Sequence, residues 1–138
     1  MQFKLAHTEV LYLQFEKINH SEVEADKGGG LDDPYKLKLS VFPDSKHPDM
    51  FGVLFDIELT HQDSFKIKLH YLAWFDGPKP FLQEDIESPF ALINAPAIAF
   101  PYLRSFISLL TLNAGCPPAF LPPINFLKMY EEAKSEKQ

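Results

Sequence analysis

Few side chains of this 138-residue sequence stand in arrangements that could do chemistry. His7 and Glu9 are two residues apart, so a β-strand would place both on one face, where they could share a metal ion. No third ligand follows at a suitable spacing, and an exposed pair on an edge strand is the stronger interpretation. His61 and His70 lie on either side of a turn, without a cysteine or carboxylate at ligand spacing. We therefore expect no metal site.

The candidates for covalent or acid–base catalysis are equally isolated. Cys116 is the only cysteine, which excludes an internal disulfide, and the two prolines after it favour a small buried thiol over a nucleophile. The adjacent carboxylates Asp32-Asp33 and Glu131-Glu132 are typical of solvated loop and tail charges. The run GGGLDDP lacks the strand, helix and lysine of a phosphate-binding loop. The sequence predicts neither an enzyme nor a cofactor.

Composition narrows the class of partner. Thirteen Lys and Arg stand against 19 Asp and Glu, and this net charge of -6 argues against nucleic acid, because phosphate contacts need clustered basic side chains. The first residues lack the basic and apolar regions of a secretory signal, and no apolar run reaches the ~18 residues of a membrane span. We expect a cytoplasmic protein with a single domain over residues 1–138.

Four segments of the first half alternate apolar and polar residues, over residues 3–15, 35–42, 51–59 and 65–75. A period of two with one apolar face is typical of antiparallel strands. In the first segment, His7 and Glu9 interrupt an apolar face. That face contains Phe3, Leu5, Leu11, Leu13 and Phe15. Residues 60–64 fit a hairpin, and the long polar link at residues 20–34 has room for a crossover loop.

The second half has a helical period. Residues 81–93 hold a short helical piece, and a longer helix is expected from about Tyr102 to Asn113. Pro101 suits the entrance of that helix and Pro96 the end of the preceding element. The segment AGCPPAFLPPINF then excludes regular structure, and a short amphipathic helix begins at about Asn125. Residues from about 131 onward are expected to fray. The fold class is therefore α+β.

A four-stranded sheet with one apolar face needs a cover, and one long and one short helix supply only part of it. Apolar area is left over around the proline-rich segment and the last helix, and such area points to oligomerisation or a binding groove. An aromatic cluster lies at the end of the fourth strand and in the residues that follow it. We interpret it as core or subunit interface in preference to a client contact; its members are Trp74, Phe75, Phe81 and Phe90.

Two motifs carry a family resemblance. Residues 95–104, APAIAFPYLR, resemble the "CPNILFPYAR" element of the SecB family of bacterial export chaperones, and LPPINF at residues 121–126 resembles that family's "LAPVNF". The two elements keep the family's spacing, and four alternating strands precede them. The likeness spans roughly residues 3 to 130.

The resemblance implies a four-stranded antiparallel sheet with a crossover loop, one long helix and a short C-terminal helix. It implies a homotetramer, a dimer of dimers, in which first strands pair within dimers and long helices meet between them. It also implies ATP-independent holding of unfolded or precursor proteins in an apolar groove. The expected client-binding residues are Tyr35, Leu37, Leu39, Phe120, Leu121, Phe126, Met129 and Tyr130.

The sequence departs from the family at the surface expected to dock the SecA motor. That surface is acidic in the family. Of the corresponding positions here, Glu16 keeps the acidic residue, whereas Tyr12 and Lys68 do not, and the lysine opposes docking to a basic tail. A chaperone dedicated to an antitoxin or another single partner is therefore the alternative. A small-ligand or enzymatic use of the fold would need convergent polar groups in a pocket, and the sequence offers few. The glycine expected after the long helix is displaced by one position, to Gly115.

Overall fold

The computed structural model describes residues 1–18, 35–61 and 65–136. Four strands come first and three helices and one π-helical turn follow, which confirms the expected α+β class. The elements in chain order are β1 (Lys4–Lys17), β2 (Tyr35–Pro43), β3 (Met50–His61), β4 (Phe65–Asp76), α1 (Gln83–Ile86), the π-helical turn η2 (Phe90–Asn94), α2 (Ala95–Asn113) and α3 (Phe126–Glu136).

The strands form one antiparallel sheet in the order β1-β4-β3-β2. Consecutive strands β3 and β4 are neighbours, which confirms the hairpin, although residues 62–64 of its turn lie outside the described chain. Strands β1 and β2 occupy opposite edges, so the chain between them connects the two edges of the sheet. The crossover loop predicted at residues 20–34, with Asp32 and Asp33, falls within residues 19–34, which also lie outside the described residues.

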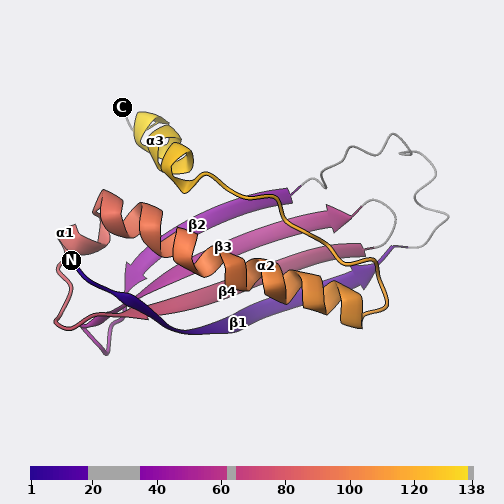
Figure 1. Ribbon diagram of the computed structural model, residues 1–138, viewed down its shortest axis with the longest axis horizontal. Coiled ribbons are helices and arrows are strands. Elements are labelled where there is room, and N and C mark those ends of the chain that lie inside the picture. The colour runs from indigo at the N-terminus through magenta and orange to yellow at the C-terminus, as the bar shows by residue number, and fades with distance from the viewer. Residues whose placement is uncertain (19–34, 62–64, 137–138) are drawn as a thin grey trace.

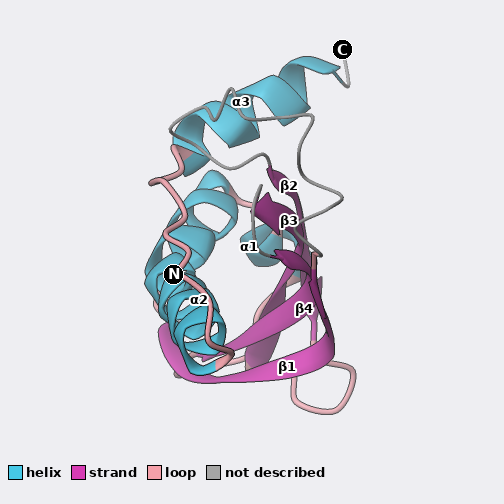
Figure 2. Ribbon diagram, turned by 90° about the vertical axis from the view of Figure 1, so that its right-hand side faces the viewer, coloured by secondary structure: helices cyan, strands magenta, loops and turns pink. Residues whose placement is uncertain are grey.

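Helix α2 crosses one face of the sheet, here called the inner face, and no described helix covers the opposite, outer face (Figures 1 and 2). The inner face of β3 and β4 is almost completely buried, because the alternating apolar residues of these central strands meet the buried side of α2. Its fully buried side chains include Phe51, Val53, Phe55, Ile57, Phe65, Leu69, Ala73 and Phe75. The helix contributes Ala99, Phe100, Leu103 and Ile107.

Two irregularities in β1 correct the expected face assignment. The pairing with β4 shifts between Leu5 and His7 and again between Val10 and Tyr12, so one extra residue is inserted at each point. After the first shift, His7 lies opposite Trp74 on the outer face. The expectation that His7 and Glu9 interrupt the apolar face is therefore wrong, because a bulge changes which alternate residues point inward.

Helix α2 begins earlier than its sequence pattern suggested. It starts at Ala95 directly after η2, which places Pro96 in the first turn and Pro101 inside the helix. The expected entrance at Pro101 is thus wrong. Proline lacks an N–H, so Pro101 cannot donate to the carbonyl of Ala97, and its exposed ring lies on the side of the helix away from the sheet.

The stretch Phe90–Asn113 is long and apolar enough to cross a membrane by length and composition, contrary to the expectation that no such run exists. In this fold one side of the stretch packs on the inner face, where Ala91, Ala95, Ala99, Leu103 and Ile107 are completely buried. A helix that packs on a sheet in the core can be as long and as apolar as a membrane-spanning helix, so length and composition do not distinguish the two.

Helix α2 ends in a glycine cap. Gly115 has a φ of +82°, its N–H donates to the Leu112 carbonyl at 3.1 Å, and the Cys116 N–H donates to the Thr111 carbonyl at 2.9 Å. This pair of bonds defines a Schellman motif with Gly115 at the left-handed position. The displaced glycine of the sequence is therefore the residue that turns the chain out of the helix.

Helix α3 begins where the sequence predicts it. Asn125 caps its first turn, because its side-chain oxygen accepts from the Lys128 N–H at 3.0 Å. The helix continues to Glu136, whereas the sequence analysis expected fraying from about residue 131. Residues 131–136 are exposed.

The predicted aromatic cluster is divided between the two faces of the sheet. Phe75 stacks with Phe51 and contacts Phe3 edge to face, and Phe81 meets Phe51 edge to face, all on the inner face. Phe90 contacts Phe3 but is half exposed. Trp74 points to the outer face, because neighbouring residues of a strand alternate.

Candidate client-binding groove and outer sheet face

A shallow, open hollow lies where the inner face of β2 emerges from under the helices. Its volume is about 340 Å³, and its walls come from β2, the proline-rich linker and α3. Five of its eight lining residues are apolar or aromatic, and Asn125, Lys128 and Glu132 supply polar groups. The apolar members are Tyr35, Leu37, Pro123, Ile124 and Met129.

Three of the predicted client-binding residues meet in this hollow, namely Tyr35, Leu37 and Met129. Leu39 continues the inner face of β2 beyond it and is half-buried, as is Tyr130. The hollow therefore combines a sheet edge and a helix that are far apart in sequence.

Leu121 and Phe126 do not extend the open surface as expected. Leu121 is 2% exposed and Phe126 is 6% exposed, and the Phe126 ring contacts Phe100 of α2 edge to face at 5.5 Å between centroids. Their burial has a simple cause: these two side chains fasten the linker and the start of α3 to the core. The expectation that they belong to an unclaimed apolar strip is wrong.

Phe120 lies elsewhere. It is 73% exposed and borders a second hollow of about 490 Å³ on the side of α2 that faces away from the sheet. The other lining residues all come from α2; they are Pro101, Arg104, Ser105, Ser108 and Leu109. The sequence had grouped Phe120 with Met129, but the linker separates their surfaces.

A third hollow, of about 640 Å³, lies at the start of β1 beside Phe3 and Phe90. Asp49 and Asp76 contribute carboxylates to it and Lys4 contributes an amine. These groups do not form a ligand set, since the described residues contain no group of three His, Cys, Asp or Glu that could hold a metal ion.

The predicted docking residues share the outer face of the sheet. Tyr12 lies opposite His70, and Glu16 lies opposite Lys66. Lys68 pairs with Glu58 of β3 at 3.7 Å, so its charge is partly balanced within the chain.

A second cross-strand row runs beside that pair. His70 lies 3.4 Å from an oxygen of Asp56, and its ring lies over that of Tyr12 at 5.3 Å between centroids. This part of the outer face therefore carries charges of both signs in place of a continuous acidic surface.

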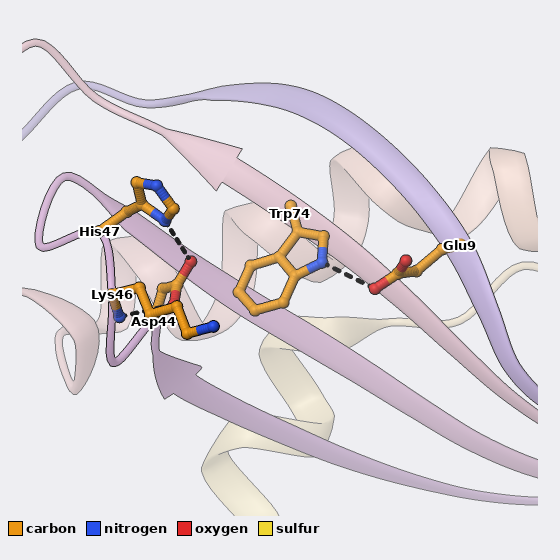
Figure 3. A network of polar contacts seen from close by, with 5 residues as sticks. All are labelled: Glu9, Asp44, Lys46, His47 and Trp74. Carbon is orange, nitrogen blue, oxygen red and sulfur yellow. Dashed lines mark hydrogen bonds and ion pairs between the residues drawn. The ribbon is translucent and has the colours of Figure 1, made fainter.

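A hydrogen bond joins β1 to β4 on the same face, and no pattern in the sequence predicts it. The indole N–H of Trp74 donates to Glu9 at 3.1 Å (Figure 3). Glu9 is thus hydrogen-bonded to a neighbouring strand. The ring centroids of His7 and Trp74 are 6.5 Å apart. This arrangement supports the interpretation of His7 and Glu9 as an exposed edge-strand pair.

The turn between β2 and β3 is held by Asp44 (Figure 3). The Lys46 backbone N–H donates to this carboxylate at 2.9 Å and holds the pKa of Asp44 below its usual value. His47 bonds the second oxygen at 3.2 Å and acts in the same direction. These hydrogen bonds order the exposed turn between β2 and β3, and they add no charged group to the outer face of the sheet.

Two further apolar surfaces are exposed in this chain. One follows the free edge strand β1, where Val10, Leu11, Tyr12 and Leu13 are 39–55% exposed. The other follows the outward side of α2, where Ile98, Tyr102, Leu109 and Leu112 are 44–57% exposed. Surfaces of this kind on a sheet edge and a helix face are typical of protein interfaces.

Comparison with known proteins shows the family of this chain. Residues 2–137 match the family model described as preprotein translocase subunit SecB. This chain belongs to the SecB family. The match confirms the resemblance seen in the two proline-containing motifs.

Relatives in sequence come from bacteria and archaea. An uncharacterized protein of Methanocaldococcus jannaschii is 31% identical over 86% of this chain and 83% of its own length. The protein-export protein SecB of Bartonella quintana is 32% identical over 78% of this chain. The match covers 59% of that SecB, so the chain spans less than two thirds of the length of this bacterial family member.

Solved structures agree on the fold. A SecB-like chaperone of Mycobacterium tuberculosis, in complex with a ChAD peptide from the HigA1 antitoxin, superposes with a TM-score of 0.65 at 20% identity, covering 88% of this chain and 89% of that one. A protein of unknown function from Streptococcus agalactiae gives 0.53 at 13% identity, covering 89% and 98%. The four-stranded antiparallel sheet with its long and C-terminal helices is therefore the SecB-like fold.

Proposed function

We propose that this SecB-family chain is an ATP-independent holdase that binds unfolded or precursor polypeptides in the cytoplasm for export. The observation that carries the proposal is the open apolar hollow formed by β2, the linker and α3. Non-native chains share little except exposed apolar segments and free backbone, so a shallow apolar surface with few polar groups suits them. We include the half-buried Leu39 and Tyr130, and the exposed Phe120, among the contacts.

We also propose that the chain works as a homotetramer, a dimer of dimers. The exposed edge of β1 supports pairing of first strands within a dimer, and the exposed residues Ile98, Tyr102 and Leu112 of α2 support contact between dimers. The hollow beside Phe120 is left to the client. Several copies of a weak groove on one particle would raise the avidity for a long unfolded client.

A second candidate is a SecB-like chaperone dedicated to an antitoxin or another single partner, without SecA docking. The outer face favours it, because Lys68 and Tyr12 occupy positions where the resemblance implies acidic docking residues. The neighbour from M. tuberculosis was solved with an antitoxin peptide, which gives the candidate a structural precedent.

The holdase is tested with the purified chain. We expect light scattering to give a mass of about four subunits, and we expect the chain to keep a chemically denatured protein in solution without nucleotide. Leu37→Ser and Met129→Ser should weaken this holding, whereas Leu82→Ser, which removes a 59% exposed leucine beside α1, should not. Circular dichroism of each variant checks that the fold is retained.

A monomer that leaves aggregation unchanged contradicts the proposal. Equal effects of all three serine variants would also contradict it, because the hollow would then have no special part in holding.

The two candidates differ in the response of the outer face. Lys68→Glu combined with Tyr12→Asp would make that face acidic, and binding of the purified SecA motor is measured for wild type and the double variant. Binding by wild type favours the export role. Binding by the double variant alone favours the dedicated chaperone, since the acidic surface would then be what this chain lacks.

A further inference from the structure

The proline-rich linker retraces helix α2. After Gly115 reverses the chain, Ala119 lies beside Ser108 and Thr111, and further along Phe126 contacts Phe100 near the start of α2. Figure 1 shows the linker running back toward the start of the helix. A segment with four prolines in seven residues cannot hold itself in place through regular backbone hydrogen bonds. Something else must fix its course.

Two side chains of α2 bind both backbone groups of a single linker residue. The Ala119 N–H donates to Thr111 Oγ1 at 3.0 Å, and the Ala119 carbonyl accepts from Ser108 Oγ at 2.7 Å. Thr111 Oγ1 in turn lies 2.9 Å from the Ile107 carbonyl, to which it donates. These bonds form a clamp, defined here as Ser108, Thr111 and Ala119.

Two of the three residues of the clamp are buried, and Ser108 is half-buried. Thr111 is 0% exposed and is the one fully buried polar side chain of the described residues, and Ala119 is 2% exposed. A buried hydroxyl that both donates and accepts is favourable only when its partners are in place, because an unpaired buried N–H costs more than a hydrogen bond gains. The clamp therefore has one preferred geometry.

That geometry decides which way the next two side chains point. Burial alternates along residues 119–121, as it does where neighbouring side chains face opposite sides. With Ala119 fixed, Leu121 enters the core at 2% exposure, and Phe120 is left 73% exposed beside Pro101 and Leu109. Because the clamp holds the backbone at Ala119, the exposed side chain of Phe120 is kept in a defined position on the surface.

We propose that Ser108 and Thr111 are positioning residues that hold the linker at Ala119 and so present Phe120 to the client. This inference rests on the proposed holdase function. It assigns the two hydroxyls a part in client binding although neither touches the client.

Thr111→Val tests the clamp, because valine keeps the shape of threonine and removes the hydroxyl. We expect hydrogen exchange of the Ala119 amide to rise roughly tenfold, as for the loss of one hydrogen bond, while exchange in the middle of α2 is unchanged. Client affinity, measured by fluorescence anisotropy with a labelled, permanently unfolded polypeptide, should fall as far as it does in Phe120→Ser. Thr111→Ser restores a hydroxyl and should restore both readouts.

Ser108→Ala is the second variant, and it keeps the proposal testable if valine at position 111 prevents folding. Ser108 is half-buried, so its loss frees only the Ala119 carbonyl and should weaken client binding by a smaller factor. Thr111→Val and Ser108→Ala together should not exceed Phe120→Ser, since all three changes act through the same side chain.

Three results would overturn the inference: unchanged client affinity in Thr111→Val beside a weakened Phe120→Ser, failure of Thr111→Ser to restore affinity, or full affinity in Phe120→Ser. The proposed function fails in a different way, namely when wild type holds no client at all. The exchange measurement distinguishes the cases, because it reports on the clamp without a client.

Discussion

The two faces of the sheet are made from alternate residues of the same strands, yet they follow different rules. On β3, Phe55 is 0% exposed and meets Phe100 of α2, whereas the next residue, Asp56, faces outward and pairs with His70. The residue types of the inner face are explained by close packing in the core. Those of the outer face are explained by their pairing with side chains on the neighbouring strand.

This difference separates what holds the fold from what gives it partners. Along β3 and β4 the inner face is closed by α2, so its residues there have no access to a client or a docking protein. At β2 the inner face opens into the hollow proposed to hold the client. The outer face has no described cover, and its cross-strand rows can change sign without disturbing the core. The family fold can therefore persist while the docking surface diverges.

The largest effect should come from the inner face. Phe55→Ala removes a completely buried ring, and we expect a loss of about 3–5 kcal/mol in the free energy of unfolding, from lost burial and the cavity left behind. Asp56→Ala, one residue away on the outer face, should cost less than about 1 kcal/mol. Both are measured by urea unfolding at one protein concentration, because subunit association also contributes to apparent stability.

A similar cost for the two variants would remove the distinction between the faces. It would mean that the outer face is also covered, for example by another subunit.

The next effect belongs to the outer face itself. A Cβ placed on Gly52 would lie 2.8 Å from Phe42 Cζ and 3.1 Å from Trp74 Cζ3, because these two rings meet edge to face across the glycine. We expect Gly52→Ala to destabilise by about 1–2 kcal/mol through overpacking. In a Phe42→Ala background the same change should cost clearly less, since the nearer ring is gone.

Equal costs in the two backgrounds would show that the backbone of β3, and not the ring contact, requires glycine. The contact of Phe42 and Trp74 across Gly52 would then not determine which residue the outer face can accept at position 52.

These examples show what the sequence could and could not predict. Alternation identified all four strands, and Pro-rich and helical patterns identified the linker and α3, because both depend on local periodicity. Local periodicity could not predict the two bulges of β1, the contact across Gly52 or the burial of Leu121. Each of these depends on which residue of a distant segment lies opposite, and that information appears only with the register.

The site was predicted in part for the same reason. The family resemblance implied a groove from the second strand, the linker and the last helix, and periodicity indicated which residues of these elements share a face. The fold brings Tyr35, Leu37 and Met129 together in one hollow. Phe120 and Leu121 are neighbours in an irregular linker, where no period says which points inward. The hydroxyls of Ser108 and Thr111 that decide it lie in another element.

A smaller effect concerns the link between β1 and β4. Trp74→Phe keeps an aromatic ring beside Phe42 but removes the N–H that donates to Glu9. We expect a loss of about 1 kcal/mol in the free energy of unfolding. Glu9→Gln keeps an acceptor oxygen and should change stability less, and a thermodynamic cycle with Glu9→Ala isolates the bond. A zero coupling energy in that cycle would mean that solvent replaces the bond without cost.

The smallest effect is expected for the ion pair of Lys68 and Glu58. Both side chains are about half exposed, at 47% and 53%, and their charged atoms are 3.7 Å apart. Exposed pairs of this kind contribute about 0–1 kcal/mol, because water and salt screen the charges and ordering two long side chains costs entropy. A double-mutant cycle with Lys68→Met and Glu58→Gln should give a coupling energy in that range, and it should shrink further when the salt concentration is raised. A coupling above about 1 kcal/mol would place this pair among the interactions that hold the fold. A small coupling energy would mean that the fold does not need a positive charge at Lys68. The charge at this position of the outer face could then vary with the partner that docks there.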